Sequence, residues 1–215
     1  MLNLVIWGAT GQAIVLEELL MGTNVEIKAF FDNDSKCISP VKNIPIYIGE
    51  IGFKLWLSTI DKGASYHYLV AIGGNTGETR SKIGKMFEDA GLKPYSAIHQ
   101  TAFIAKNALI GECAQILAQS SICARVTIGK NCIINTGASI DHECILGNNV
   151  HIGPGAKLAG SIIIEDNVFV GINATILPRI KIGKNAIIGA GAVVTKDVLA
   201  DRTVVGNPAR LINNL

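Results

Sequence analysis

The chain is poor in aromatic and charged side chains. Aromatic residues make up 6% of its 215 residues and charged residues 17%, with a formal net charge of +2. No run of five or more basic residues occurs, which argues against nucleic acid as a partner. No apolar stretch reaches the length of about eighteen residues that a membrane span needs, and no cleavable signal segment opens the chain. We therefore expect a cytoplasmic protein without membrane insertion.

Paired cysteines are also missing. The 5 cysteines form no C-x-x-C motif, so neither a redox pair nor a cysteine metal site is indicated. Cys132 and Cys144 occupy the small inward position of the repeat described next. Small apolar filling of a core is the better interpretation for them.

A strict period of six residues dominates the second half of the chain. Every sixth residue is Ile, Leu or Val, without an insertion: Ile104, Ile110, Ile116, Ile122, Ile128, Ile134, Ile140, Leu146, Ile152, Leu158, Ile164, Val170, Ile176, Ile182, Ile188 and Val194. The residue four places later is usually small. This pattern predicts a parallel β-helix in which three hexads form one coil. About five coils would make a prism roughly 25 Å tall.

The first hundred residues lack this period and read as a small α/β domain. Apolar runs at 2–7, 25–31 and 68–72 alternate with helical stretches, and Gly8-Ala9-Thr10-Gly11 follows the first run. That order predicts a Rossmann-like domain over residues 1–98, followed by the β-helix domain with a C-terminal tail over 99–215. Glycine turns at strand ends let backbone N–H groups approach phosphates. The full G-x-G-x-x-G fingerprint is absent, so we expect nucleotide or nucleotide-sugar binding rather than nicotinamide chemistry.

One coil carries the residues suited to catalysis. His142 lies between Asp141 and Glu143 and is the third residue of its hexad, so it points away from the core. An acidic neighbour can hold the ring in one tautomer and raise its basicity, as a general base requires. His151 follows nine residues later.

The unbroken period converts residue numbers into positions on the prism. Gly160 follows His142 by eighteen residues, one full coil, and should stack directly on it. His151 lies half a coil away and must face another side, with Asn135 close to its azimuth one coil below. A single subunit therefore cannot easily place both histidines around one small substrate. A trimer of parallel prisms can, which predicts a homotrimer with active sites at the subunit interfaces.

The chain resembles the left-handed β-helix acyltransferases. The resemblance rests on the hexad ladder, the segment Asn-Thr-Gly-Ala-Ser-Ile-Asp-His-Glu-Cys ending at Cys144, and Val-Gly-Asn-Pro-Ala-Arg ending at Arg210. The turn Gly-Ala-Thr-Gly-Gln-Ala and the Phe-Phe-Asp ending at Asp32 narrow it further. They resemble bacterial sugar O/N-acetyltransferases of the sialic acid and bacillosamine type, particularly those that N-acetylate UDP-4-amino-4,6-dideoxy sugars. The left hand of the coil follows from this resemblance.

The resemblance also implies roles for individual residues. It assigns the general base to His142 and the carboxylate that supports it to Glu143. Contacts with acetyl-CoA, the co-substrate, fall on His151, Gly160, Ile172 and Ala190. Contacts with the nucleotide-linked amino sugar fall on Thr10, Gly11, Gln12, Asp32, Asn33 and Gly73, to which the coil arithmetic adds Asn135. Gln12 replaces a histidine of some relatives and Asn33 an aspartate, so the preferred sugar or nucleotide can differ.

The expected reaction is direct acetyl transfer from acetyl-CoA to the sugar amine, without a metal or a covalent cysteine intermediate. An O-acetyltransferase of sialic acid would use the same base, so the acceptor stays open between an amine and a hydroxyl. The nucleotide stays open among UDP, GDP and dTDP. A carbonic anhydrase of similar architecture needs three histidine ligands, whereas only His142 and His151 are suitably placed. A nucleotide-sugar-binding scaffold protein is the non-enzymatic alternative.

Overall fold

The computed structural model describes residues 1–212, which form two compact units. The first comprises Met1–Ile72 and Lys82–Ala97, and the second comprises Gly73–Ser81 and the chain from Ile98 onward. The segment Gly73–Ser81 therefore packs with the second unit although it precedes residue 99. The division into a domain of residues 1–98 and a domain of residues 99–215 stays a prediction.

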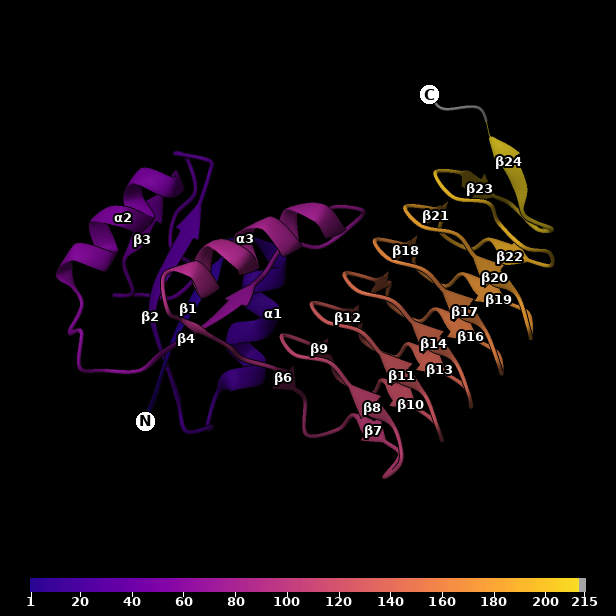
Figure 1. Ribbon diagram of the computed structural model, residues 1–215, viewed down its shortest axis with the longest axis horizontal. Coiled ribbons are helices and arrows are strands. Elements are labelled where there is room, and N and C mark those ends of the chain that lie inside the picture. Colours follow the sequence, from indigo (N-terminus) through magenta and orange to yellow (C-terminus); the bar gives the residue numbers. More distant parts are fainter. Residues whose placement is uncertain (213–215) are drawn as a thin grey trace. The chain divides into compact units, whose positions relative to one another are not determined.

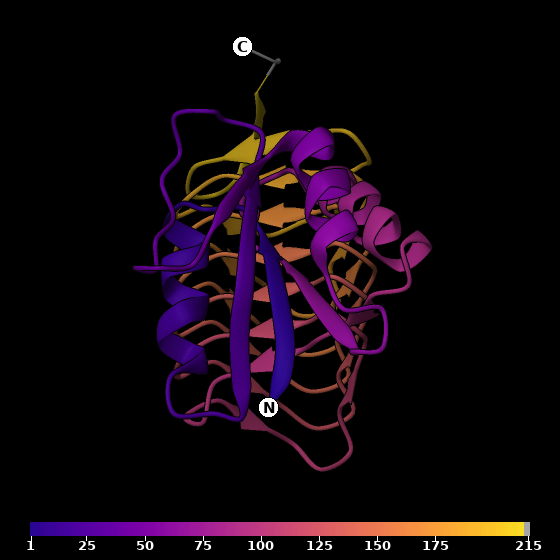
Figure 2. The same ribbon diagram turned by 90° about the vertical axis from the view of Figure 1, so that its left-hand side faces the viewer.

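The first unit is built on a parallel sheet in the order β3-β2-β1-β4-β5. Helices cover both of its faces, α1 on one and α2 with α3 on the other (Figure 2). The strands are β1 (Leu2–Trp7), β2 (Val25–Asp32), β3 (Ile46–Ile48), β4 (Tyr66–Val70) and β5 (Lys93–Pro94), and the helices are α1 (Gly11–Leu20), α2 (Gly49–Thr59) and α3 (Gly77–Asp89). Since β1 pairs with both β2 and β4, their carboxyl ends lie at one edge, as the α/β prediction requires.

Aromatic side chains, scarce in the sequence, gather in the core of this unit. The ring of Phe31 lies with its centroid 5.6 Å from Trp7, 5.4 Å from Phe53, 5.5 Å from Trp56 and 5.9 Å from Phe87. These residues come from β1, β2, α2 and α3, so one cluster fixes the helices on the sheet. Offset and edge-on aromatic pairs add specific geometry to the apolar burial.

The second unit is a parallel β-helix whose three sheets form the faces of a prism (Figure 1). Strands on one face pair with those one coil away at a spacing of eighteen residues, as in Ser121 with Ser139. The strands are β6 (Ala97–Ile98), β7 (Phe103–Ile104), β8 (Leu109–Ile110), β9 (Gln115–Ile116), β10 (Ser121–Ile122), β11 (Thr127–Ile128), β12 (Ile133–Ile134), β13 (Ser139–Ile140), β14 (Ile145–Leu146), β15 (His151–Ile152), β16 (Lys157–Leu158), β17 (Ile163–Ile164), β18 (Phe169–Val170), β19 (Thr175–Ile176), β20 (Lys181–Ile182), β21 (Ile187–Ile188), β22 (Val193–Val194), β23 (Thr203–Val205) and β24 (Arg210–Ile212).

The predicted inward positions form the core of the prism. Ile140 and the small residues Ala138 and Cys144 are fully buried, and Cys132 is equally enclosed. Burial raises the pKa of the Cys132 thiol to about 12, so it stays a neutral, apolar filler. The sequence prediction for these cysteines is confirmed.

One edge of the prism carries a ladder of asparagine side chains. Asn131 donates through Nδ2 to Asn149 Oδ1 at 3.2 Å, Asn149 to Asn167 at 3.0 Å, and Asn167 to Asn185 at 3.0 Å. Each of these residues has a positive φ, between 57° and 62°, which asparagine adopts more readily than most residues. The ladder therefore has two effects: it provides hydrogen-bond partners for the asparagine amides, and it stabilises the turns in which these residues lie.

Candidate active site

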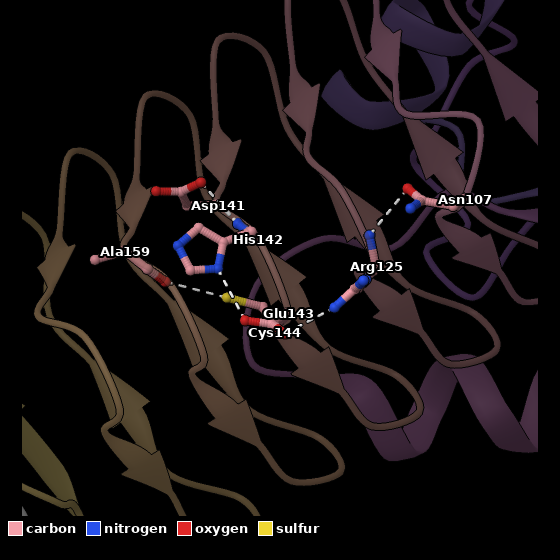
Figure 3. Close-up of polar contacts among 7 residues, drawn as sticks. All are labelled: Asn107, Arg125, Asp141, His142, Glu143, Cys144 and Ala159. Atoms are coloured by element: carbon pink, nitrogen blue, oxygen red, sulfur yellow. Dashed lines mark hydrogen bonds and ion pairs between the residues drawn. The ribbon is translucent and has the colours of Figure 1, made fainter.

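His142 stands in the turn between β13 and β14, at the edge where two faces of the prism meet. Its side chain is 56% exposed, and its Nδ1 lies 3.2 Å from Oε2 of Glu143 (Figure 3). With the proton on Nδ1 directed to this carboxylate, Nε2 keeps its lone pair free to accept a proton. This is the arrangement that a general base needs.

Asp141 does not share this task. Its Oδ1 accepts the backbone N–H of His142 at 2.7 Å and so holds the main chain of the turn. Of the two acidic neighbours that the sequence offered, only Glu143 contacts the ring. The flanking order alone could not decide between them, because the choice depends on turn geometry.

Gly160 stacks on His142 as the spacing predicted. A Cβ built on Gly160 would lie 2.6 Å from both Cε1 and Nε2 of the imidazole, so a side chain there would displace the ring from this position. Ser161 N–H donates to the His142 carbonyl at 2.8 Å and joins the two coils. The ring therefore lies against the bare backbone of Gly160.

Arg125 is a contributor that the sequence reasoning missed. Its Nη1 lies 3.4 Å from Oε1 of Glu143, so this carboxylate is shared between a guanidinium and the His142 ring. Its backbone N–H donates to Asn107 Oδ1 at 3.1 Å (Figure 3). Arg125 precedes Glu143 by one coil, and the spacing of eighteen residues was the signal that could have found it.

His151 lies on a different face, in β15, and is buried with 6% exposure. Gly74 N–H donates to its Nδ1 at 2.8 Å, and the Asn135 amide lies 3.3 Å from Nε2. Burial, together with the nearby Arg80 cation, lowers the pKa of His151 to about 4. The ring is thus neutral near pH 7, and its predicted proximity to Asn135 is present.

Ile172 and Ala190, the other two predicted contacts with acetyl-CoA, lie one coil apart at the edge between the sheets of β15 and β16. Ile172 is 52% exposed, and Gly191 N–H, next to Ala190, donates to its carbonyl at 2.7 Å. A Cβ at Gly171 would come within 2.6 Å of Ala190 N, so the backbones of these coils pack closely, and Ala190 itself is exposed. Their predicted contact with acetyl-CoA remains a prediction.

The predicted acceptor residues in the first unit gather at the carboxyl edge of its sheet. Asp32 accepts the Ala9 N–H through Oδ2 at 2.9 Å and the Asp34 N–H through Oδ1 at 3.0 Å, which fixes the glycine turn after β1. Thr10 precedes α1 without a side-chain cap, and Gly11 and Gln12 open the helix. Asn33 follows β2 at the same edge. Gly73, in contrast, belongs to the second unit, and its Cβ position lies 3.4 Å from His151 Cε1.

Comparison with known proteins identifies the family. The model of the bacterial transferase hexapeptide family matches residues 107–142, 125–160 and 161–196. PerB from Caulobacter crescentus, crystallised with CoA and GDP-perosamine, is 32% identical over 98% of this chain and 97% of its own, with a TM-score of 0.88. The chain belongs to the hexapeptide-repeat sugar N-acetyltransferases. These sugar N-acetyltransferases are CoA-dependent enzymes, and their prism is the left-handed β-helix that the resemblance implied.

Two further solved structures are similar over nearly the whole chain. The acetyltransferase domain of PglB from Neisseria gonorrhoeae, in complex with acetyl coenzyme A, is 28% identical over 98% of both chains, with a TM-score of 0.83. WeeI from Acinetobacter baumannii is 27% identical over 99% of this chain and 100% of its own, with a TM-score of 0.84. Within residues 1–212, no group of three side chains suited to a metal ion occurs, and no helix has the length and apolarity to cross a membrane.

Proposed function

We propose that this protein transfers the acetyl group of acetyl-CoA to the amino group of a nucleotide-linked amino sugar, with His142 as general base. The observation that carries the proposal is the stack of Glu143, His142 and Gly160: a carboxylate at 3.2 Å from Nδ1, and bare backbone beneath Nε2. A protein that only binds a nucleotide sugar does not need a general base, so this arrangement argues against a scaffold protein. The amine attacks the thioester carbonyl, Nε2 takes its proton, and the coenzyme A thiolate leaves.

We infer the remaining contacts with acetyl-CoA and with the acceptor from the family resemblance. The Gly160 N–H and the ring of His151 would stabilise the negative charge that develops on the thioester oxygen. Ile172 and Ala190 would contact the coenzyme, while Thr10, Gly11, Gln12, Asp32, Asn33, Gly73 and Asn135 would contact the acceptor. The acceptor we infer is a 4-amino-4,6-dideoxy sugar. UDP is the nucleotide that the resemblance implies; among the nucleotides left open, GDP is supported by the relative from Caulobacter crescentus, which was crystallised with GDP-perosamine. We propose that the reaction is cytoplasmic.

We further propose that three chains form the catalytic unit. His142 is 56% exposed on an outer edge, and the outer face formed by β8, β11, β14, β17 and β20 exposes Leu109, Ile145 and Ile163 to 66%, 51% and 44%. A cleft of about 610 Å³ at the C-terminal end of the prism contains none of the predicted site residues. Both observations favour a site completed by a neighbouring subunit.

The test is an acceptor panel with a base variant. Purified protein is incubated with acetyl-CoA and UDP-, GDP- or dTDP-linked 3- and 4-amino sugars, or with sialic acid, and thiol release is followed. We expect turnover of a 4-amino sugar, and a loss of about 10²–10⁴-fold in kcat/KM for His142→Ala, roughly 3–5 kcal/mol of transition-state stabilisation. The matched control His99→Asn, at a histidine that accepts the Thr101 N–H, should keep full activity. Unchanged kcat/KM in His142→Ala would overturn the base assignment, and exclusive sialic acid turnover would assign O-acetylation instead.

A further inference from the structure

A short segment outside the repeat lies directly on the prism. Gly73–Ser81 packs with the second unit and includes the first turn of α3. A Cβ at Gly77 would lie 2.8 Å from the Asn149 carbonyl oxygen, so the backbone of this turn touches the backbone of a coil. Such an approach fixes the segment in place and allows no side chain at position 77.

Arg80 anchors the same segment from the next turn of the helix. Its exposure is 1%, its Nε donates to the Asn131 carbonyl at 3.2 Å, and its Nη2 donates to the Asn149 carbonyl. These carbonyls belong to adjacent coils at the edge that carries the asparagine ladder. Burial lowers the pKa of Arg80 to about 10, so it is still a cation near pH 7. Removing such a group is costly, because the two carbonyls would lose charge-assisted hydrogen bonds.

The N-terminal end of the segment contacts the histidine of β15. Gly74 N–H donates to His151 Nδ1 at 2.8 Å. Because a backbone N–H can only donate, Nδ1 must be the acceptor in this hydrogen bond. A neutral imidazole that accepts at Nδ1 carries its proton on Nε2. The Asn135 side chain lies 3.3 Å from Nε2, and with its amide turned its oxygen accepts the Nε2 proton until an acyl oxygen takes that place. The Thr136 N–H then gives up Asn135 Oδ1 as its acceptor.

From these contacts we propose that Arg80 and Gly74 are positioning residues that hold His151 in the Nε2–H tautomer, as a neutral hydrogen-bond donor for the acyl group. The donor role rests on the function proposed above, whereas the tautomer does not. The groups that face the ring are the Arg80 cation, the Gly74 N–H, the Asn135 amide and the Phe169 ring, whose centroid lies 5.2 Å away. The pKa of about 4 agrees with a ring that stays neutral through the physiological range.

The direct test is nuclear magnetic resonance of the full chain with ¹⁵N-labelled histidine. The His151 signals are assigned by their loss in His151→Gln. We expect a protonated, pyrrole-type Nε2 and an unprotonated Nδ1 in the unmodified protein, without titration above about pH 5. A predominant Nδ1–H tautomer, or a ring that titrates near pH 6.5, would overturn the proposal before any variant is made.

Variants then test the two anchors separately. In Arg80→Met, and independently in Gly77→Ala, we expect signals averaged between the two tautomers and titration of His151 at higher pH. Arg80→Lys should restore part of the original pattern. Lys82→Met removes an exposed cation from the same helix and should change neither property. A His151 spectrum unaffected by both Arg80→Met and Gly77→Ala, in folded protein, would contradict the positioning role.

Kinetics separate this inference from the proposed function. If His151 donates to the thioester, Arg80→Met should raise KM for acetyl-CoA or lower kcat/KM by about 3–10-fold, the value of one hydrogen bond, with the loss growing as the pH falls from 7 to 5. A protein that acetylates no acceptor but shows the Nε2–H tautomer would reject the proposed function alone. An active enzyme whose His151 has the other tautomer would reject this inference alone.

Discussion

The Glu143 carboxylate has two partners, the ring of the proposed base and a guanidinium. Oε2 faces His142 at 3.2 Å and Oε1 faces Arg125 at 3.4 Å. A guanidinium partly neutralises the carboxylate and at the same time holds it in place. Since the side chains of Arg125 and Glu143 are 73% and 48% exposed, solvent screens the pair and its effect is small.

We predict that Arg125→Met lowers kcat/KM by less than about threefold, because a solvent-screened ion pair contributes little to holding the Glu143 carboxylate. The measurement is a series of initial rates against acceptor concentration with saturating acetyl-CoA. Arg125→Lys should retain the original kcat/KM. Lys106→Met, which removes an exposed cation without touching Glu143, serves as the control. A loss of tenfold or more would show that the guanidinium is needed to orient the carboxylate.

At the scale of elements, the six-residue period predicted the strands because every hexad has the same environment. One aliphatic rung and one small partner fill one side of a narrow core, as Ile140 and Cys144 do. In the first domain the sequence predicted the strand ends less accurately. The third run was expected over 68–72, but β4 spans Tyr66–Val70, because the chain leaves the sheet ahead of the Gly73–Gly74 turn. In a doubly covered sheet, apolar runs continue past the strand ends and do not mark them.

The asparagine ladder provides a prediction at this scale. Asn167→Ala removes hydrogen bonds to Asn149 and Asn185 and leaves alanine at a φ of 62°, so the free energy of unfolding should fall by roughly 2–3 kcal/mol. Asn167→Gly should lose about 1 kcal/mol less, because glycine accepts this φ. Chemical denaturation at fixed protein concentration measures both. Arg179→Ala, at an exposed corner with a φ of 63°, should change stability by less than about 0.5 kcal/mol. Equal losses in the free energy of unfolding for all three variants would contradict a stabilising role of the asparagine ladder.

For the whole molecule, the arrangement of His142 and His151 on different faces predicts that activity requires subunit contact. His142 lies exposed in the turn between β13 and β14, whereas His151 lies in β15. We consider sites that combine His142 of one chain with His151 of a neighbour. A trimer that mixes chains lacking His142 with chains lacking His151 then still contains complete sites.

We therefore predict complementation between His142→Ala and His151→Ala. In the mixed trimers that contain both variants, about one third of the sites should contain both histidines and recover that share of wild-type activity. Co-expression with two tags, followed by tandem purification and thiol-release assays, provides the measurement. Each variant assembled alone is the control. No recovery in mixed trimers, or a monomer by light scattering with full wild-type activity, would place the site within one chain.

The sequence by itself determined the β-helix, the inward and outward residues of each coil, and the stack of Gly160 on His142. It could do so because an uninterrupted repeat makes residue number a measure of position. Only the tertiary structure decided that Glu143 rather than Asp141 supports the ring, that Gly74 donates to His151, and that Arg80 anchors the same segment on the coils. The first choice depends on turn geometry. The second depends on a segment outside the repeat, whose path across the prism no period in the sequence encodes.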